Sequence, residues 1–253
     1  MRGVRPCPFG ECDGSGFVVD AEARTTRACR CRPQRIAAAK ARRLSAVIPR
    51  RYRGVSFDRP PVTHIARPVV EAVRRYVRDL DANLDKGQGL WLEGGVGTGK
   101  TTLAMLVSRT AIESGRTVAI YSLPRLLAEL RKTFDEGSDL SYLQLLDSLT
   151  SVDLLHVDDL GAEKSSPWVL EQLYSIINAR YEEERSVVVT TNLTHSELRE
   201  QIGERTVSRL VEMCSDPIPL WGEDKRMELP EPEPPAEPWS PPDPAALRYG
   251  VGP

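Results

Sequence analysis

The stretch Gly94-Gly95-Val96-Gly97-Thr98-Gly99-Lys100-Thr101 decides the fold of this chain. It matches the pattern G-x-x-x-x-G-K-[ST], whose glycines let backbone N–H groups point at phosphates while the lysine reaches the β and γ oxygens. Residues 89–93 before it are expected to form a buried strand, and the helix that follows, with Thr102, adds its positive N-terminus to the cradle. The sequence therefore predicts a nucleoside triphosphate site at which Thr101 binds Mg²⁺.

Beyond this stretch, short apolar segments alternate with longer segments of helical periodicity. The predicted strands are residues 117–121, 152–157 and 186–190, and the predicted helices are residues 69–80, 102–107, 123–132, 141–148, 168–183 and 195–201. Apolar strands that alternate with helices are typical of a parallel sheet covered on both faces. We therefore expect an α/β fold with three layers.

Two carboxylates close the strand predicted at residues 152–157. Asp158 is placed to hold Mg²⁺ through its water shell, and Asp159 to orient the attacking water. The alternative is an acidic strand end that faces solvent. Asn192 ends the next strand and is placed to hydrogen-bond the γ-phosphate or the water, although Asn after a strand is also a common turn signal. His156, inside the strand, is expected to be a buried core residue.

Arg205 and Arg209 lie four residues apart in the segment 203–210, so they share one face of a predicted helix. Two arginines on one face can point together at an anion, and an arginine that reaches a neighbouring subunit's γ-phosphate accelerates hydrolysis by about 10³–10⁵. The alternative for each is an arginine that is exposed or paired within its own chain.

Four of the five cysteines lie within the first 31 residues, namely Cys7, Cys12, Cys29 and Cys31. Two close pairs separated by a short loop can hold Zn²⁺ tetrahedrally, and residues 17–19 and 27–29 are expected to pair as a small hairpin. The spacings are C-x4-C and C-x-C rather than the usual C-x2-C, so a disulfide pair or unliganded thiols stay as alternatives. Cys214 is expected to be a buried core thiol.

The 253 residues suffice for one α/β domain with appendages. We divide them into a zinc-binding module (1–33), a basic helical linker (34–60), an ATPase domain (61–228) and a disordered tail rich in Pro and Glu (229–253). Residues 1–55 contain 13 basic and 4 acidic side chains, which indicates nucleic acid or an acidic protein surface as partner, or simply a solvated basic helix. No apolar run approaches the ~18 residues of a membrane span and no signal peptide is recognisable, so we expect a cytoplasmic protein without membrane contact.

Four segments together resemble the AAA+ ATPases of the DnaC/DnaI-type replicative helicase loaders, in the IstB-like clan. The segments are residues 94–101, 152–161, 187–193 and 203–210. The resemblance covers roughly Pro49 to Met227 and implies a P-loop AAA+ three-layer sandwich. After Arg209 the sequence predicts only a last strand at residues 218–222 and then the tail, so no full helical lid follows, as in these loaders. The four-cysteine start is similar to the zinc-binding module that some of them carry.

The resemblance also implies the cofactors and the site residues. ATP and Mg²⁺ would bind at residues 94–102, with Asp158 and Asp159 as the Walker B pair. Lys100, Asp159, Asn192 (as sensor 1) and Arg209 (as the arginine finger) would be catalytic, while the choice between Arg205 and Arg209 stays open. A lone chain would then be a weak ATPase that a neighbouring subunit's arginine completes.

The partners implied by the resemblance are the replicative DNA helicase, single-stranded DNA, and further copies of the chain assembled on DNA or helicase. Two other functions stay open, namely an IstB-like transposition helper ATPase and an ATP-gated adaptor that does not hydrolyse. The cysteine-rich start favours the loader over the transposition helper, and the pair Asp158-Asp159 argues mildly against the adaptor.

Overall fold

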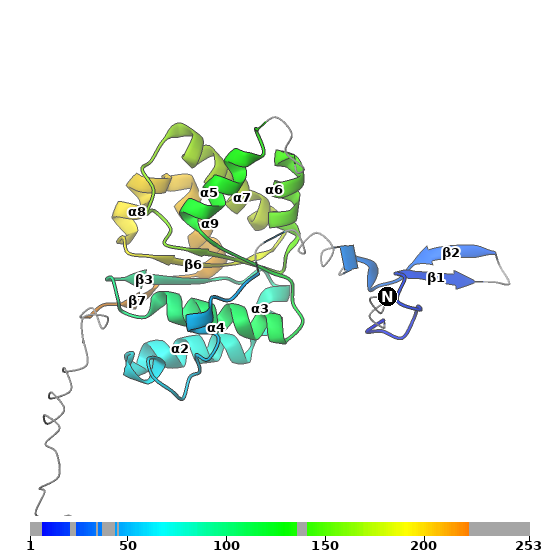
Figure 1. Cartoon of the computed structure of the whole chain (residues 1–253), viewed down its shortest axis with the longest axis horizontal. Helices are drawn as coiled ribbons and strands as arrows, with labels where there is room; N and C mark the ends of the chain where they lie inside the picture. Colours follow the sequence, from blue (N-terminus) through cyan, green and yellow to red (C-terminus); the bar gives the residue numbers. More distant parts are fainter. Residues whose placement is uncertain are drawn as a thin grey trace, which may run out of the picture.

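The computed structural model describes residues 7–20, 24–33, 35–36, 44, 46–135 and 141–222. Near the N-terminus, β1 (Phe17–Asp20) pairs antiparallel with β2 (Thr25–Ala28), as the sequence predicted (Figure 1). The Arg32 guanidinium lies 3.9 Å from the centroid of the Phe17 ring, so a cation–π contact covers one side of this hairpin. Most of the predicted linker helix and the predicted tail lie outside the described residues.

A five-stranded parallel sheet forms the centre of the larger part of the chain. Its strands lie in the order β4 (Val118–Ser122), β5 (Leu154–Asp158), β6 (Ser186–Thr191), β3 (Leu90–Gly94) and β7 (Ile218–Leu220). All pairs are parallel. Because the carboxyl ends of parallel strands meet at one edge, the ends of β3, β5 and β6 bring the segments after them together there.

Helices cover both faces of this sheet (Figure 1). One layer consists of α2 (Arg67–Arg78), α3 (Leu80–Asp85) and α4 (Lys100–Glu113). The other consists of α5 (Leu123–Lys132), α6 (Tyr142–Ser151), α7 (Pro167–Glu182), α8 (His195–Ile202) and α9 (Glu204–Cys214). Each layer buries its own apolar cluster against the sheet, with Leu154 in one and Leu155 in the other. The predicted three-layer α/β fold is therefore confirmed.

One predicted helix is divided. The periodicity over residues 69–80 predicted one helix, but α2 ends at Arg78, and α3 begins at Leu80 after Asp79 leaves the helical conformation (φ −100°, ψ 23°). The Asn83 side-chain amide donates a hydrogen bond of 3.0 Å to the Tyr76 carbonyl, which the break deprives of a helical partner. A side chain beyond the break, which periodicity does not weigh, therefore stabilises the division.

The fully buried Arg180 of α7 links this helix to α6 and to the sheet. Its guanidinium donates hydrogen bonds to the carbonyls of Leu149 at the end of α6, Val152 before β5 (3.0 Å) and Ser186 at the start of β6 (2.6 Å). Burial lowers the pKa of Arg180 to about 9, so the group stays charged at neutral pH. One cation thus satisfies several buried carbonyls that no solvent can reach.

Replacing Arg180 by Met tests this role. We expect the Arg180→Met variant to lose about 3 kcal/mol or more of unfolding free energy, because several buried carbonyls lose their donors. Arg185→Met is the matched control, since Arg185 is partly exposed and pairs with Asp153 at 3.4 Å, a contact worth about 0–1 kcal/mol. Equal urea midpoints for the two variants would contradict the account.

Candidate nucleotide-binding site

The loop between β3 and α4 depends on glycine. Gly94, Gly97 and Gly99 have φ values of 149°, 75° and 101°, which favour residues without a Cβ. A Cβ on Gly94 would also collide with the Leu220 carbonyl of the neighbouring strand β7. The sequence Gly94–Thr101 therefore forms a tight loop that directs the N-terminus of α4 at the sheet edge, as a phosphate cradle requires.

Lys100 is the first residue of α4 and its side chain is 5% exposed. Its ammonium donates hydrogen bonds to the carbonyls of Gly94 (2.8 Å) and Gly95 (2.6 Å) and to Asn192 Oδ1 (2.7 Å). The sequence predicted Asn192 as a contact of the phosphate or the water, and the structure joins it directly to Lys100. The loop after β6 and the loop after β3 thus share one cation.

Asp158 and Asp159 close β5 at the same edge. Thr190 of β6 binds both residues, because its hydroxyl donates to Asp158 Oδ1 (2.7 Å) and accepts from the Asp159 backbone N–H (2.9 Å). Asp159 has a φ of 56°, a left-handed conformation that Asp tolerates better than most residues. Sequence reasoning gave Thr190 no role, because only the register of β5 and β6 reveals the contact.

The carboxyl group of Asp158 is held in its charged form. Burial acts to raise its pKa, but the side chains of His156, Thr190 and Thr101 outweigh burial, and the pKa lies below its ordinary value. A carboxylate near the Thr101 hydroxyl is the oxygen-rich arrangement that Mg²⁺ prefers. The residues therefore fit Mg²⁺ at the place where the sequence predicted it.

A pocket opens over the loop, lined by segments far apart in the chain. Besides residues 96–102, Asp159 and Asn192, four residues before α2 line it, namely Arg51, Tyr52, Pro61 and Ile65. Sequence reasoning missed these four, and it placed residues 51 and 52 in the linker. Their aromatic and apolar groups suit the flat face of a base, while the Arg51 guanidinium lies 4.6 Å from the Tyr52 ring centroid.

Residues 69–214 match the model of the family described as IstB-like ATP binding protein. The chain belongs to this family. The match spans β3 to α9 and so contains the phosphate loop, both aspartates and Asn192. The predicted AAA+ fold is confirmed by the similarity to the solved DnaC helicase loader.

Several proteins of known name are similar to this chain. The replicative helicase loader DnaC of Buchnera aphidicola (strain APS) is 29% identical over 160 residues, which are 63% of this chain and 64% of the relative. DnaC of Escherichia coli K12 is 29% identical over 137 residues, 54% of each chain. The chain therefore spans less than two thirds of the length of the curated relatives it matches.

Solved structures agree on the fold. The crystal structure of the DnaC helicase loader superposes with a TM-score of 0.58 at 26% identity, over 69% of this chain and the whole of that chain. The crystal structure of DnaI gives a TM-score of 0.53 at 23% identity, over 71% of this chain and 94% of that chain. At that identity the DnaI likeness concerns the fold alone.

The two candidate arginines, Arg205 and Arg209, lie on α9. No residue of α9 lines the nucleotide pocket of the same chain, so both arginines lie apart from it. The Arg209 guanidinium lies 4.1 Å from the Tyr181 ring centroid and donates to Glu212 Oε1 at 3.3 Å. The Tyr181 hydroxyl donates to Glu212 Oε2 at 2.7 Å, so the three side chains form one cluster. Arg205 is exposed and has no interaction partner among the described residues.

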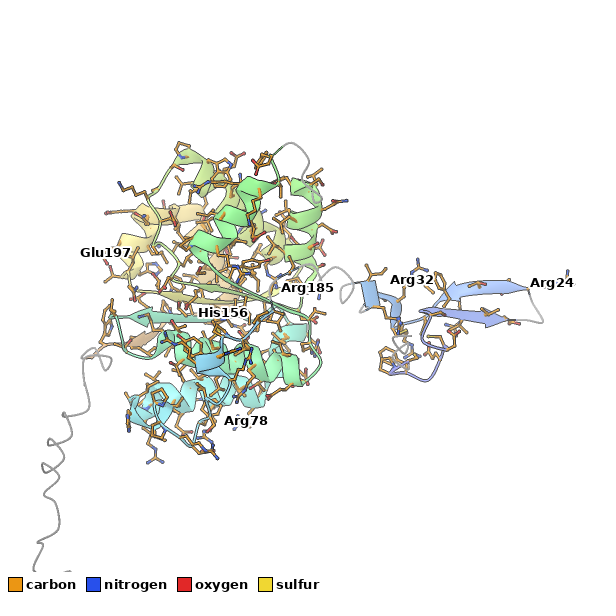
Figure 2. All side chains as sticks on the ribbon, viewed as in Figure 1. Arg24, Arg32, Arg78, His156, Arg185 and Glu197 are labelled. Carbon is orange, nitrogen blue, oxygen red and sulfur yellow. The ribbon has the colours of Figure 1, made fainter. Side chains whose placement is uncertain are left out.

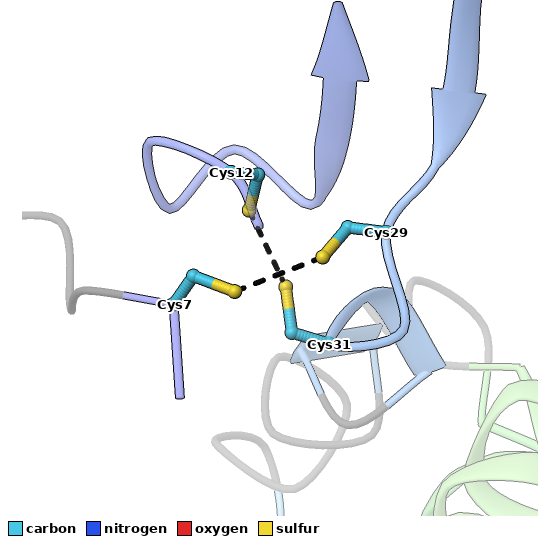
Figure 3. A group of neighbouring side chains, drawn as sticks. All are labelled: Cys7, Cys12, Cys29 and Cys31. Atoms are coloured by element: carbon cyan, nitrogen blue, oxygen red, sulfur yellow. Dashed lines mark hydrogen bonds between the residues drawn. The ribbon is translucent and has the colours of Figure 1, made fainter. Parts of the chain in front are cut away.

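The four N-terminal cysteines converge (Figure 3). Cys7 Sγ lies 3.7 Å from Cys29 Sγ, Cys12 Sγ lies 3.6 Å from Cys31 Sγ, and all four sulfur atoms lie within 4.8 Å of one another. Four sulfurs at 2.3 Å from a tetrahedral ion lie about 3.8 Å apart, so the separations fit Zn²⁺. None of the four forms a disulfide. Cys214 is buried, as predicted.

The thiols of this cluster differ in acidity. Burial opposes ionisation of Cys7, but backbone hydrogen bonds from Cys12, Phe9 and Glu11 outweigh it and lower its pKa to about 6. Burial and the neighbouring thiols raise the pKa of Cys31 to about 12. Neighbouring thiolates repel one another, and a bound cation would offset this repulsion, because cysteines bind metals as thiolates.

The Lys100→Ala variant tests the nucleotide site. We expect its affinity for a fluorescent ATP analogue to fall about 100-fold or more, since the charge that meets the phosphates is lost. Lys86→Ala, which removes an exposed lysine remote from the loop, should bind as the unaltered chain does. Retained affinity in Lys100→Ala, measured by fluorescence titration, would contradict the assignment.

Proposed function

We propose that this chain is an ATP-dependent loader of a replicative DNA helicase. The observation that carries the proposal is the joint presence of a phosphate loop, an aspartate pair and Asn192 at one sheet edge in a chain similar to proteins named replicative helicase loader. ATP binding would promote assembly with helicase and DNA, and hydrolysis would release the loader. A bound nucleotide would take the donors of Lys100 and the N-terminus of α4.

Hydrolysis needs groups that bind Mg²⁺ and orient water. In this proposal Thr101 and Asp158 would hold Mg²⁺, which would supply positive charge to the phosphates during phosphoryl transfer. Asp159 orients the attacking water, and Asn192, held by Lys100, faces the γ-phosphate. The remaining group, an arginine at the γ-phosphate, would come from a second copy of the chain.

Arg209 is the better candidate for this arginine, and Arg205 would assist it. The Tyr181 ring and Glu212 hold the Arg209 guanidinium in place outside its own nucleotide pocket, and 34% of the side chain is exposed. An ordered guanidinium loses less conformational entropy when it meets a phosphate. Arg205, one helical turn nearer the start of α9, presents a second cation on the same face.

Single-stranded DNA is the proposed nucleic acid, and α5 and α6 are its proposed contact. The rings of Phe134 and Tyr142 stack with their centroids 5.6 Å apart, and Phe134 is 62% exposed. The Arg131 guanidinium lies 5.0 Å from the Trp168 ring centroid. Exposed aromatic rings interleaved with basic side chains are the usual surface for unpaired bases and their phosphates. Lys132 adds a further cation to this surface.

No helix in the described ranges is both long and apolar enough to cross a bilayer. The cysteine cluster would bind one Zn²⁺ and so provide folding energy to a hairpin too small to have a core of its own.

The second candidate is the IstB-like transposition helper, because the family model is described as IstB-like ATP binding protein. Such a helper shares the nucleotide site but acts with a transposase on duplex DNA. A pull-down of the purified replicative helicase of the same organism, with and without ATP, separates the two functions. We expect ATP-sensitive association with the helicase that Lys100→Ala abolishes. Equal recovery in both conditions, or none, would contradict the loader.

The Asp159→Asn variant tests the catalytic assignment. Asn tolerates the left-handed backbone at this position, so the loop should keep its conformation. We expect ATP binding within about twofold of the unaltered chain and ATP turnover reduced about 100-fold or more, because the group that polarises the water is lost. Turnover is measured as phosphate release, and turnover at the original rate would contradict the role of Asp159.

Metal analysis of the purified chain tests the zinc site. We expect one Zn²⁺ per chain, and loss of most of it in Cys12→Ser, because one ligand of four is removed. Cys214→Ser is the matched control, since this buried cysteine lies outside the cluster and should leave the zinc content unchanged. A chain without zinc, or equal zinc in both variants, would contradict the assignment.

A further inference from the structure

His156 occupies an unusual place, in the middle of β5 and two residues before Asp158. Its side chain is fully buried, and Figure 2 shows it at the level of the sheet. Alternate residues of a strand face the same side, so Leu154, His156 and Asp158 all face the layer that contains α4. The strand partners opposite His156 are Ile120 of β4 and Val188 of β6, both apolar. A polar ring in these surroundings needs specific partners.

One ring nitrogen has a partner and the other does not. His156 Nδ1 lies 2.9 Å from the hydroxyl of Ser108, which is fully buried on α4. His156 Nε2 has no hydrogen-bond partner within the described part of the chain, and it lies 3.9 Å from Asp158 Oδ1. The ring therefore stands between the helix that begins at Lys100 and the carboxylate that closes β5.

The position of the ring proton decides whether this arrangement is favourable. A neutral imidazole carries one N–H, and the hydrogen bond at one nitrogen fixes the state of the other. If the Ser108 hydroxyl donates to Nδ1, the proton lies on Nε2 and faces the Asp158 carboxylate. In the other tautomer a lone pair would face the carboxylate, which is repulsive at low dielectric.

We propose that Ser108 at Nδ1 and the Asp158 carboxylate near Nε2 together hold His156 as its Nε2–H tautomer, and that His156 positions the Asp158 carboxylate for Mg²⁺. The N–H of His156 and the hydroxyl of Thr190 then both act on Oδ1 of Asp158. Thr190 hydrogen-bonds this oxygen at 2.7 Å, whereas the N–H of His156, with Nε2 at 3.9 Å, attracts it electrostatically. Together they favour one rotation of the carboxylate and thus one direction of Oδ2. The inference rests on the proposed function, because it concerns the same Mg²⁺·ATP site.

Ser108 and His156 are positioning residues in this account, because neither lines the nucleotide pocket. Mutation of a residue that positions a metal ligand typically lowers metal affinity by about 10–100-fold. The chain Ser108–His156–Asp158 would also link α4, whose N-terminus meets the phosphates, to the strand that holds the metal. A shift of α4 would then move the carboxylate.

The tautomer is measured directly by long-range ¹⁵N–¹H correlation spectra of the full chain with ¹⁵N-labelled histidine, in which signals lost in His156→Gln identify His156. We expect a protonated Nε2 and an unprotonated Nδ1, and a mixture of tautomers in Ser108→Ala. A protonated Nδ1 in the unaltered chain would overturn the proposal.

The second readout is the Mg²⁺ concentration that gives half-maximal binding of a fluorescent ATP analogue. We expect it to rise about 10-fold in His156→Phe and less in Ser108→Ala, with analogue affinity at saturating Mg²⁺ within about twofold. His156→Gln, whose amide N–H can lie near the position of Nε2, should restore most of the original value. Ser148→Ala removes a buried hydroxyl on α6 and is the control for stability alone.

The outcomes separate the inference from the proposed function. If Ser108→Ala, His156→Gln and His156→Phe all need the same Mg²⁺ concentration as the unaltered chain, the positioning role is overturned. The proposed loader function would not be affected by that result. Analogue binding by the unaltered chain that ignores Mg²⁺ altogether would contradict both. If His156→Phe fails to fold, the tautomer spectra and the Ser108→Ala titration decide the matter.

Discussion

The buried ammonium of Lys100 is the interaction on which the nucleotide site depends. It joins the loop after β3 to Asn192 after β6, so two strand ends that are distant in sequence act as one unit. A buried cation needs several acceptors to remain charged, and the carbonyls of Gly94 and Gly95 provide them. Glycine is required at position 94 because β7 passes too close for a side chain. The parallel sheet thereby dictates both the loop and the direction of the lysine.

The same sheet separates the groups that the proposed hydrolysis requires. The phosphate loop and the aspartates lie at the carboxyl edge, whereas Arg209 lies on the helical layer formed by α7 and α9, in contact with Tyr181 and Glu212. A chain built in this way holds ATP with one surface and offers a cation with another. In the proposed function, assembly of copies therefore controls hydrolysis.

Sequence patterns predicted the parts of this molecule that depend on local geometry. Glycine spacing identified the loop, and apolar runs identified all five strands of the sheet within about two residues. Thr190 and Ile65 were missed because their contacts follow from strand register and from the packing of a distant segment. The buried role of Arg180 was missed because periodicity does not show which carbonyls lie unsatisfied beneath a helix. The cysteines could be grouped by number, but their pairwise distances needed the structure.

The central claim is that one chain's nucleotide site is completed by Arg209 of a second chain. Lys100→Ala chains keep Arg209 and are expected not to bind ATP, whereas Arg209→Ala chains are expected to bind it. Mixing the two variants tests the claim most directly. Phosphate release is measured on helicase and single-stranded DNA for each variant alone and for the mixture. The account predicts slow turnover for each variant alone and recovery of a substantial fraction of the original rate on mixing. Turnover that stays slow in the mixture, or Arg209→Ala chains that hydrolyse at the original rate alone, would contradict it.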